Sequence, residues 1–237
     1  MKGDSIPPRG EVTKLDSTLL DSIKEVVDLS VPLKSLDTPV FPGYPQPLRS
    51  TFTTVVQDGY ASYVWTFAEH TSTHVDSPAH FFDGALTVDR VPVNRYVGRG
   101  IVLDFTGKPA RYSITKDDIS SRLEKMKVKP GPGWIILFYT GYTEKSGSKE
   151  WLDHPELSDD ASRYIASLEV FAVGFDAPSP DHAPFPGHKI LLPKVISVYE
   201  NLTNLDKLLG KNFLFVGPPL ALAGGSASPV RALALVL

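Results

Sequence analysis

The sequence predicts a single mixed-sheet α/β domain, on three observations. Strand-length apolar runs outnumber amphipathic helical patterns, which favours a sheet that is not purely parallel. The 21 prolines and 18 glycines are scattered rather than collected at one boundary, so no linker divides residues 1–237. A hydrophobic content of 42% is sufficient for a sizeable core. We therefore expect one domain, with residues 1–25 as an N-terminal extension or helix.

Seven runs have the length and composition of β-strands. They span residues 61–67, 100–105, 134–139, 170–175, 195–199, 213–216 and 230–237. Residues 134–138 and 232–236 are apolar throughout, which is typical of strands covered on both faces.

Four helical patterns lie before or between these runs. Thr115 and Asp118 resemble a capping box, and Ser158 is a typical N-cap residue. A helix is predicted after each of these caps. Two further helices are predicted over residues 17–27 and 202–209, the latter closed by Gly210.

Composition excludes several classes of function. A formal net charge of -3 provides no positive field for nucleic acid. The chain has no cysteine, so disulfides, thiol nucleophiles and cysteine-held metals are excluded. No apolar stretch has the length of a secretion signal or membrane span, which predicts a cytoplasmic protein without a membrane partner.

Three of the six histidines fall within residues 70–80. His70 and His74 share a face in a strand or a helix, and His74 and Asp76 share a face of an extended chain. Pro78 disfavours a helix through the whole motif, so a strand end or loop is expected. Imidazoles with a carboxylate suit Zn²⁺, Mn²⁺ or Fe²⁺ better than Ca²⁺ or Mg²⁺. The segment predicts a metal site, against the alternative of surface or core histidines.

Other catalytic motifs find little support. The segment Gly224-Gly225-Ser226-Ala227-Ser228 lacks the closing glycine of a serine nucleophile elbow. Neither G-x-G-x-x-G nor G-x-x-x-x-G-K-[ST] occurs, which excludes nucleotide binding by those loops.

Residues 70–81, HTSTHVDSPAHF, resemble the H-x-G-T-H-x-D-x-P-x-H-F signature of the cyclase-like metal-dependent hydrolases, a family that includes bacterial kynurenine formamidase and isatin hydrolase. The resemblance runs from about residue 26 to the C-terminus. It also rests on the segments Asp28-Leu29-Ser30, Phe41-Pro42-Gly43, Thr140-Gly141, Phe185-Pro186-Gly187-His188, residues 199–205 and residues 224–232.

The resemblance implies one or two divalent ions, with Zn²⁺ the first expectation and Mn²⁺ the next. In a binuclear site, His70, His74 and Asp76 would hold the first metal, His188 would hold the second, and Asp76 and Glu200 would bridge. From the residue alone, Glu200 is expected to be a solvated carboxylate at a strand end, and only the resemblance reverses that expectation. The resemblance further implies a swivelling β/β/α type of fold and a homodimer or higher homo-oligomer.

Roles in catalysis follow the same resemblance. His80 matches the catalytic histidine, and Phe41 takes the place of an aromatic residue that contacts substrate. Phe81 and Phe82 follow His80 directly and are candidates for the substrate pocket, with core packing as the alternative. Tyr44 is a further pocket candidate. Trp65 is expected in the core.

Some residues depart from the family pattern or lie outside it. Ser72 stands where the signature has Gly, so either the backbone there does not need a positive φ or the turn has shifted. Phe41 and Tyr44 replace the Trp and Asp of the formamidase's W-P-G-D segment, which weakens that specific activity. His182 is expected in a loop and His154 on the surface.

These observations predict a metal-dependent hydrolase acting on a small molecule. The leading expectation is an arylformamidase, a kynurenine formamidase-like enzyme of tryptophan catabolism, in which a hydroxide held by the metal attacks a formyl or cyclic amide. His80 would transfer the proton. Isatin- or lactone-type ring opening on another metabolite, and a metal- or ligand-binding protein without turnover, remain as alternatives.

Overall fold

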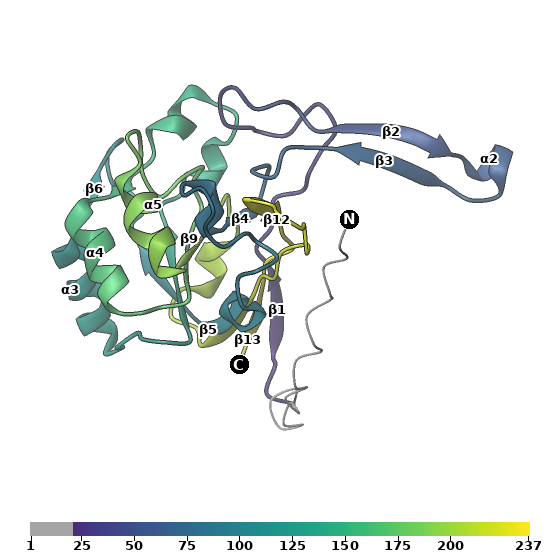
Figure 1. Cartoon of the computed structure of the whole chain (residues 1–237). Helices are drawn as coiled ribbons and strands as arrows, with labels where there is room; N and C mark the ends of the chain where they lie inside the picture. The colour runs from purple at the N-terminus through teal and green to yellow at the C-terminus, as the bar shows by residue number, and fades with distance from the viewer. Residues whose placement is uncertain (1–20) are drawn as a thin grey trace.

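The computed structural model describes residues 21–237, which build a nine-stranded mixed sheet with helices on one face (Figure 1). Four neighbouring strands, β5, β7, β9 and β10, run parallel, and the outer strands pair antiparallel. In spatial order the sheet contains β1 (Glu25–Asp28), β13 (Leu233–Val236), β11 (Phe213–Val216), β5 (Val97–Asp104), β7 (Trp134–Tyr139), β9 (Ala172–Phe175), β10 (Ser197–Glu200), β4 (His74–Asp76) and β12 (Ala227–Pro229). The predicted mixed α/β class is confirmed.

The central strands divide their side chains between two cores. In β7, Ile136 and Phe138 enter the first core, while Ile135 and Leu137 enter the second core on the opposite face of the sheet. This alternation follows from the two-residue period of a strand. The apolar run 134–138 is therefore covered on both faces, as its composition predicts.

Three helices cover the first core. They are α3 (Lys116–Met126), α4 (Asp159–Ser167) and α5 (Pro186–Leu191). The capping box of Thr115 and Asp118 is formed, and the Ser158 hydroxyl caps α4. Helix α5 was not apparent in the sequence because it is short and has no side-chain N-cap; it begins at a proline, which is favoured in the first helical turn.

Two of the predicted helices differ in the structure. Of the helix predicted over residues 17–27, positions 17–20 lie outside the described residues, and positions 25–27 belong to β1, which pairs with β13. The pairing and the burial of Val27 override the helical pattern. Residues 202–209 form only a short 3₁₀ turn, Leu205–Leu208, before Gly210.

A separate two-stranded ribbon extends from the body of the protein (Figure 1). It consists of β2 (Leu48–Thr53), the short helix α2 (Val55–Asp58) and β3 (Ser62–Thr66). Trp65 lies on this ribbon with 37% of its surface exposed, so its predicted place in the core is wrong. The composition of residues 61–67 predicts a strand, but it does not show whether another layer of the protein packs on that strand.

The remaining regular elements are short. Strands β6 (Ser113–Ile114) and β8 (Glu156–Leu157) pair with each other. Further 3₁₀ turns span Pro78–His80, Val93–Tyr96, Thr143–Lys145, Lys149–Asp153 and Leu192–Lys194. Between residues 21 and 237, no helix has the length and apolar character required to cross a membrane.

Gly100 tests the packing between β5 and β11. A Cβ atom at this position would lie 1.8 Å from Cε2 of Phe213, its cross-strand partner. We expect Gly100→Ala to lower the free energy of unfolding by about 1–3 kcal/mol, because the ring has to move. Urea unfolding measures this change. Gly131→Ala is the control, since its nearest contact is 3.9 Å away; equal effects of the two substitutions would contradict the packing described here.

Candidate metal centre

The pairing of β4 with β10 sets the centre of the site. His74 lies directly opposite Glu200, and Asp76 lies opposite Val198. Directly opposed residues share a face of an antiparallel pair, so His74, Asp76 and Glu200 point to the same side. Val75, between the two ligand candidates, points into the second core.

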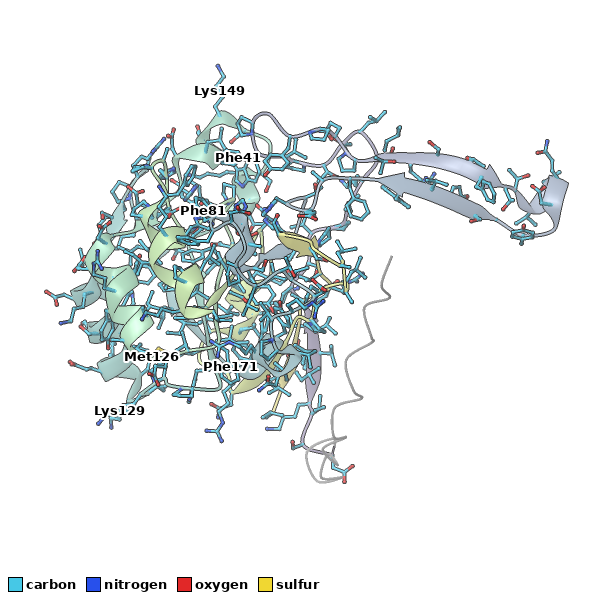
Figure 2. All side chains as sticks on the ribbon, viewed as in Figure 1. Phe41, Phe81, Met126, Lys129, Lys149 and Phe171 are labelled. Atoms are coloured by element: carbon cyan, nitrogen blue, oxygen red, sulfur yellow. The ribbon has the colours of Figure 1, made fainter. Side chains whose placement is uncertain are left out.

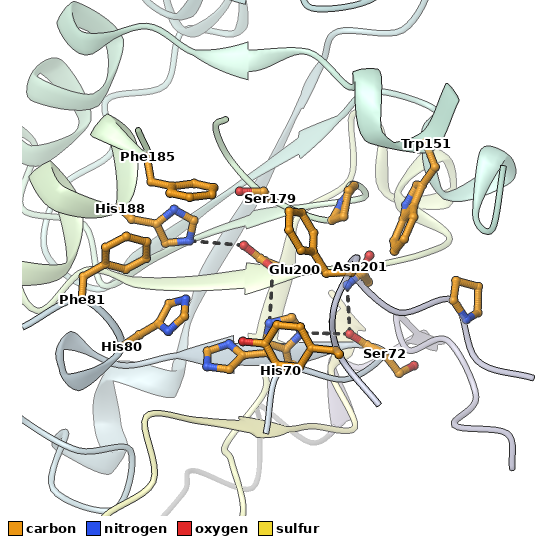
Figure 3. Close-up of a pocket in the computed structure, with 15 residues that line it drawn as sticks. His70, Ser72, His80, Phe81, Trp151, Ser179, Phe185, His188, Glu200 and Asn201 are labelled. Atoms are coloured by element: carbon orange, nitrogen blue, oxygen red, sulfur yellow. Dashed lines mark hydrogen bonds and ion pairs between the residues drawn. The ribbon is translucent and has the colours of Figure 1, made fainter. Parts of the chain in front are cut away.

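Two histidines from outside these strands complete the cluster. His70 lies in the loop before β4, with Nδ1 2.8 Å from Oδ1 of Asp76. His188 lies on α5, with Nε2 3.4 Å from Oδ2 of Asp76 and 3.3 Å from Oε1 of Glu200. The structure thus brings together all five residues that the resemblance implies as metal ligands. Figure 3 shows His70, His188 and Glu200 of this group at the edge of the cavity.

The two carboxylates each contact more than one imidazole. Oδ1 of Asp76 lies 3.4 Å from Nε2 of His74, in addition to its contact with His70. Oε2 of Glu200 lies 3.3 Å from the same His74 nitrogen, while Oε1 contacts His188. Both carboxylates therefore occupy bridging positions within the cluster.

A neighbouring acceptor orients each of the three histidines. Nδ1 of His74 lies 2.9 Å from the Ser72 carbonyl oxygen, and Nδ1 of His188 lies 2.8 Å from Oδ1 of Asp181. When these Nδ1 atoms donate, each Nε2 lone pair points into the cluster. Asp181 was not predicted as a site residue, although its neighbour His182 was noted as a histidine outside the family pattern.

His70 is oriented in the opposite sense. Its Nε2 lies 3.1 Å from Oγ of Ser226, which donates to Oε2 of Glu69 at 2.7 Å. Ser226 can therefore accept a hydrogen bond from Nε2–H, which leaves the Nδ1 lone pair directed at Asp76. Ser226 belongs to the glycine-serine segment that lacks a nucleophile elbow, and here it supports a histidine.

Several buried atoms of the cluster have no hydrogen-bond partner among the described residues. They are Nε2 of His74, Nε2 of His188 and both carboxylate oxygens of Asp76. Buried polar atoms are nearly always satisfied, so a group of orphaned lone pairs facing one another indicates a cation. Three imidazoles with two carboxylates fit Zn²⁺ or Mn²⁺.

The ligand atoms form two overlapping groups. His70, Asp76 and His80 make one, and His74, Asp76 and Glu200 make the other, with the chosen atoms of each group within 4.8 Å of one another. Asp76 belongs to both, as a bridging ligand would. This division differs from the implied one: His80 takes the place of His74 beside His70 and Asp76, His74 is grouped with Glu200 instead, and His188 belongs to neither group.

The electrostatic field of the cluster favours positive charge. Burial disfavours the imidazolium form, but Asp76 and Glu200 outweigh it and raise the pKa of His74 to about 10. Burial also opposes charge on Asp76, yet the surrounding imidazoles hold its pKa well below the usual range. In the absence of a metal, the cluster holds protons where a cation would otherwise sit.

His80 differs from the other histidines at the site. Burial lowers the pKa of His80 to about 4, although nearby Asp76 opposes the shift. Its ring lies 3.9 Å from that of His70, centroid to centroid, and faces the cavity (Figure 3). A neutral imidazole at this place can accept a proton or bind a metal.

Ser72 lies at the position where the family signature has glycine, and its backbone shows whether the turn there needs a positive φ. Its φ is +57°, so the turn does require the left-handed region, and serine adopts it. The Ser72 hydroxyl donates to the Val31 carbonyl at 2.7 Å. Its own carbonyl accepts from the Asn201 amide at 3.1 Å as well as from His74. These bonds hold the turn despite the strained φ.

A cavity of about 220 Å³ opens beside the cluster. Its apolar wall is formed mainly by aromatic residues and proline, including Pro39, Phe41, Tyr44, Phe81, Trp151 and Phe185. Of the predicted substrate contacts, the structure brings Phe41 and Phe81 to the cavity. Phe82 is not among its lining residues and packs instead against the first core. Trp151 and Phe185 were not predicted, because nothing in their local sequence marks them as pocket residues.

The last two histidines lie together, apart from the cluster. His154 and His182 stack with ring centroids 4.1 Å apart, and Nε2 of His182 lies 3.0 Å from the His154 carbonyl oxygen. His154 is buried, so its predicted surface position is wrong. Burial lowers the pKa of His154 to about 4, which keeps this pair from being doubly charged at neutral pH.

Solved structures share this arrangement of elements. An isatin hydrolase bound to the product analogue thioisatinate matches with a TM-score of 0.83 at 24% identity, covering 92% of this chain and 94% of the other. A protein described as a potential metal-dependent hydrolase with cyclase activity matches with a TM-score of 0.73 at 29% identity, covering 89% and 96%.

Sequence comparison leads to the same group of proteins. An uncharacterized protein of Methanocaldococcus jannaschii is 32% identical over 216 residues, 90% of this chain and 100% of the relative. Kynurenine formamidase of Bordetella avium is 28% identical over 220 residues, 89% of this chain and 97% of the enzyme. The family model described as "Putative cyclase" matches residues 27–182, so this chain belongs to that cyclase family.

Proposed function

We propose that this chain is a metal-dependent amidohydrolase that either hydrolyses a formyl amide or opens a cyclic amide by hydrolysis. One observation carries the proposal: His70, His74 and His188 converge on Asp76 and Glu200, and four of the buried atoms that face one another lack hydrogen-bond partners. Arylformamidase activity is the first candidate, supported by the name of the Bordetella avium relative.

The five residues of the cluster would hold one or two divalent ions, zinc first and manganese next. A bound ion of this kind lowers the pKa of water from 15.7 to about 7 and polarises a carbonyl group. Asp181, Ser72 and Ser226 keep the imidazole lone pairs directed inward. The protein thereby holds the imidazole nitrogens that would bind the ion in fixed orientations, away from solvent.

His80 is the proposed proton carrier. Its low pKa leaves the ring neutral at pH 7, so it can accept a proton when water attacks the carbonyl. The same ring can then deliver that proton to the departing nitrogen. The Phe81 ring stacks on His188 with centroids 4.8 Å apart and closes one side of the cavity, which limits access of bulk water.

The aromatic wall supports a flat or aromatic substrate. Phe41, Trp151 and Phe185 present apolar surface to the cavity. Isatin-type ring opening is the second candidate, because Phe41 and Tyr44 replace the Trp and Asp of the formamidase segment, and the fold matches an isatin hydrolase. A swivelling β/β/α fold type and an assembly of identical subunits remain expectations from the resemblance, and a cytoplasmic location remains an expectation from the sequence.

The first prediction concerns metal binding. We expect chelator-treated protein to take up Zn²⁺ or Mn²⁺, and to gain about 2.7 kcal/mol of stability at a hundredfold excess of ion over the dissociation constant. Asp76→Asn should abolish uptake, because both ligand groups lose a member. Elemental analysis and thermal unfolding provide the readouts. Asp117→Asn, on the exposed face of α3, is the control; normal metal content in Asp76→Asn would refute the site.

The second prediction concerns His80. We expect His80→Ala to reduce kcat about 10²–10⁴-fold on N-formylkynurenine or isatin, whichever the wild type accepts, with metal content unchanged. His182→Ala is the matched control, because this histidine does not line the cavity. Normal turnover in His80→Ala would refute the proton-carrier role. Loss of metal would instead make His80 a ligand, and metal without turnover on any amide or lactone would favour a binding protein.

A further inference from the structure

The loop of residues 36–47 forms one wall of the cavity and is closed by hydrogen bonds at its base. The Thr38 amide donates to Oε1 of Gln46 at 3.2 Å, and Nε2 of Gln46 donates to the Thr38 carbonyl at 3.0 Å. The Leu36 amide donates to the Pro47 carbonyl at 2.8 Å. These bonds join the two ends of the loop, so the residues between them are held in a defined shape.

A β-turn within this loop places two aromatic side chains on the cavity. The turn is Phe41-Pro42-Gly43-Tyr44, in which the Tyr44 amide donates to the Phe41 carbonyl at 3.1 Å. Proline at the second position and a glycine with φ of +94° at the third are typical of a type II turn. Phe41 and Tyr44 both line the cavity, and Figure 2 shows Phe41 close to Phe81, which lines it as well. The turn thus fixes the place of Tyr44 at the site.

Tyr44 lies next to the candidate metal centre with its hydroxyl unused. Its ring meets the His70 ring edge-on, with centroids 6.0 Å apart and planes at 63°. The side chain is partly exposed, and its hydroxyl has no hydrogen-bond partner among residues 21–237. A phenol, with an ordinary pKa of about 10, keeps its proton at neutral pH. Tyr44 therefore offers a hydrogen-bond donor beside one of the candidate ligands.

The other hydroxyl and amide donors of the cavity already serve the protein itself (Figure 3). Oγ of Ser72 donates to the Val31 carbonyl at 2.7 Å, and Oγ of Ser179 donates to Oδ1 of Asp181 at 3.1 Å. Nδ2 of Asn201 donates to the Ser72 carbonyl at 3.1 Å. Each of these side chains holds the backbone or a histidine partner in place, so none of the three bonds is free for a substrate.

Two further observations single out the Tyr44 hydroxyl. Nε1 of Trp151 is buried from solvent, although the Trp151 side chain lines the cavity. None of the described residues that line the cavity is a lysine or an arginine. A carbonyl oxygen that enters a largely apolar cavity loses its hydrogen bonds to water, and leaving it unpaired is unfavourable. The Tyr44 hydroxyl is an uncharged donor that can replace the lost bond.

We propose that the Tyr44 hydroxyl donates a hydrogen bond to the carbonyl oxygen of the scissile amide and is a catalytic residue, an inference that rests on the proposed function. Negative charge develops on this oxygen when water attacks the carbonyl carbon, so the bond is stronger in the transition state than in the bound substrate. The proton stays on the phenol throughout. Tyr44 stands where the W-P-G-D segment has Asp, which accepts when ionised, so this donor distinguishes the present chain from that segment.

The first test measures binding without turnover. Tyr44→Phe keeps the ring against His70 and removes only the hydroxyl. In chelator-treated protein, we expect this variant to bind isatin or N-formylkynurenine about 3–10-fold more weakly than the wild type, measured by quenching of tryptophan fluorescence. Tyr60→Phe is the matched control, because Tyr60 lies at the end of the two-stranded ribbon with 59% of its surface exposed. Equal affinities of wild type and Tyr44→Phe for both probes, including no binding by either protein, would overturn the proposal.

The second test uses the metal-loaded protein and the probe that the wild type hydrolyses. We expect Tyr44→Phe to lower kcat about 10²-fold at unchanged metal content, and KM to rise no more than the affinity falls. Unchanged kcat would overturn the catalytic role, and loss of metal would show that Tyr44 only positions His70. A wild type that binds the probes but hydrolyses no amide would refute the proposed function, while the binding measurement still decides whether the Tyr44 hydroxyl contacts the carbonyl.

Discussion

The site depends on one constraint: two carboxylates must lie buried among imidazoles without the water that would otherwise solvate them. Isolated buried carboxylates are strongly unfavourable, and a low dielectric strengthens both repulsion and attraction. The register of β4 against β10 places Asp76 and Glu200 on one face, and the histidines supply the opposite polarity around them. A shift of one residue in this register would turn His74 and Asp76 into the apolar core and bring Val75 to the site.

Neighbouring residues orient the three histidines so that their lone pairs face the carboxylates. Each of the three candidate ligand histidines is held by a different acceptor: a carboxylate for His188, a backbone carbonyl for His74 and a serine hydroxyl for His70. The carbonyl that holds His74 belongs to Ser72, in the left-handed region, and Asn201, also with positive φ, donates to the same oxygen. Two strained positions from distant segments thus stabilise one another beside the ligands.

The sequence predicted most of the strands and the residues that gather in the candidate metal centre, but not the geometry that joins them. Residues 134–139 and 213–216 were apolar and short enough to be assigned as strands with the observed bounds. The motif of residues 70–80 was informative because its spacing and chemistry are local. Asp181, Trp151 and Phe185 were missed because their roles depend on tertiary contacts alone, and the 17–27 pattern was misassigned because edge pairing with β13 decides that segment.

The position of β4 in the sheet has a consequence for biosynthesis. This strand lies between β10 and β12, which both follow it in the chain by a long distance. While the ribosome is still producing the C-terminal half, the nascent β4 has neither neighbour, and its backbone donors and acceptors remain available to other chains. Both neighbours of β4 therefore form only late in translation, and a chain terminated before residue 197 would lack Glu200 and could not assemble the candidate metal centre.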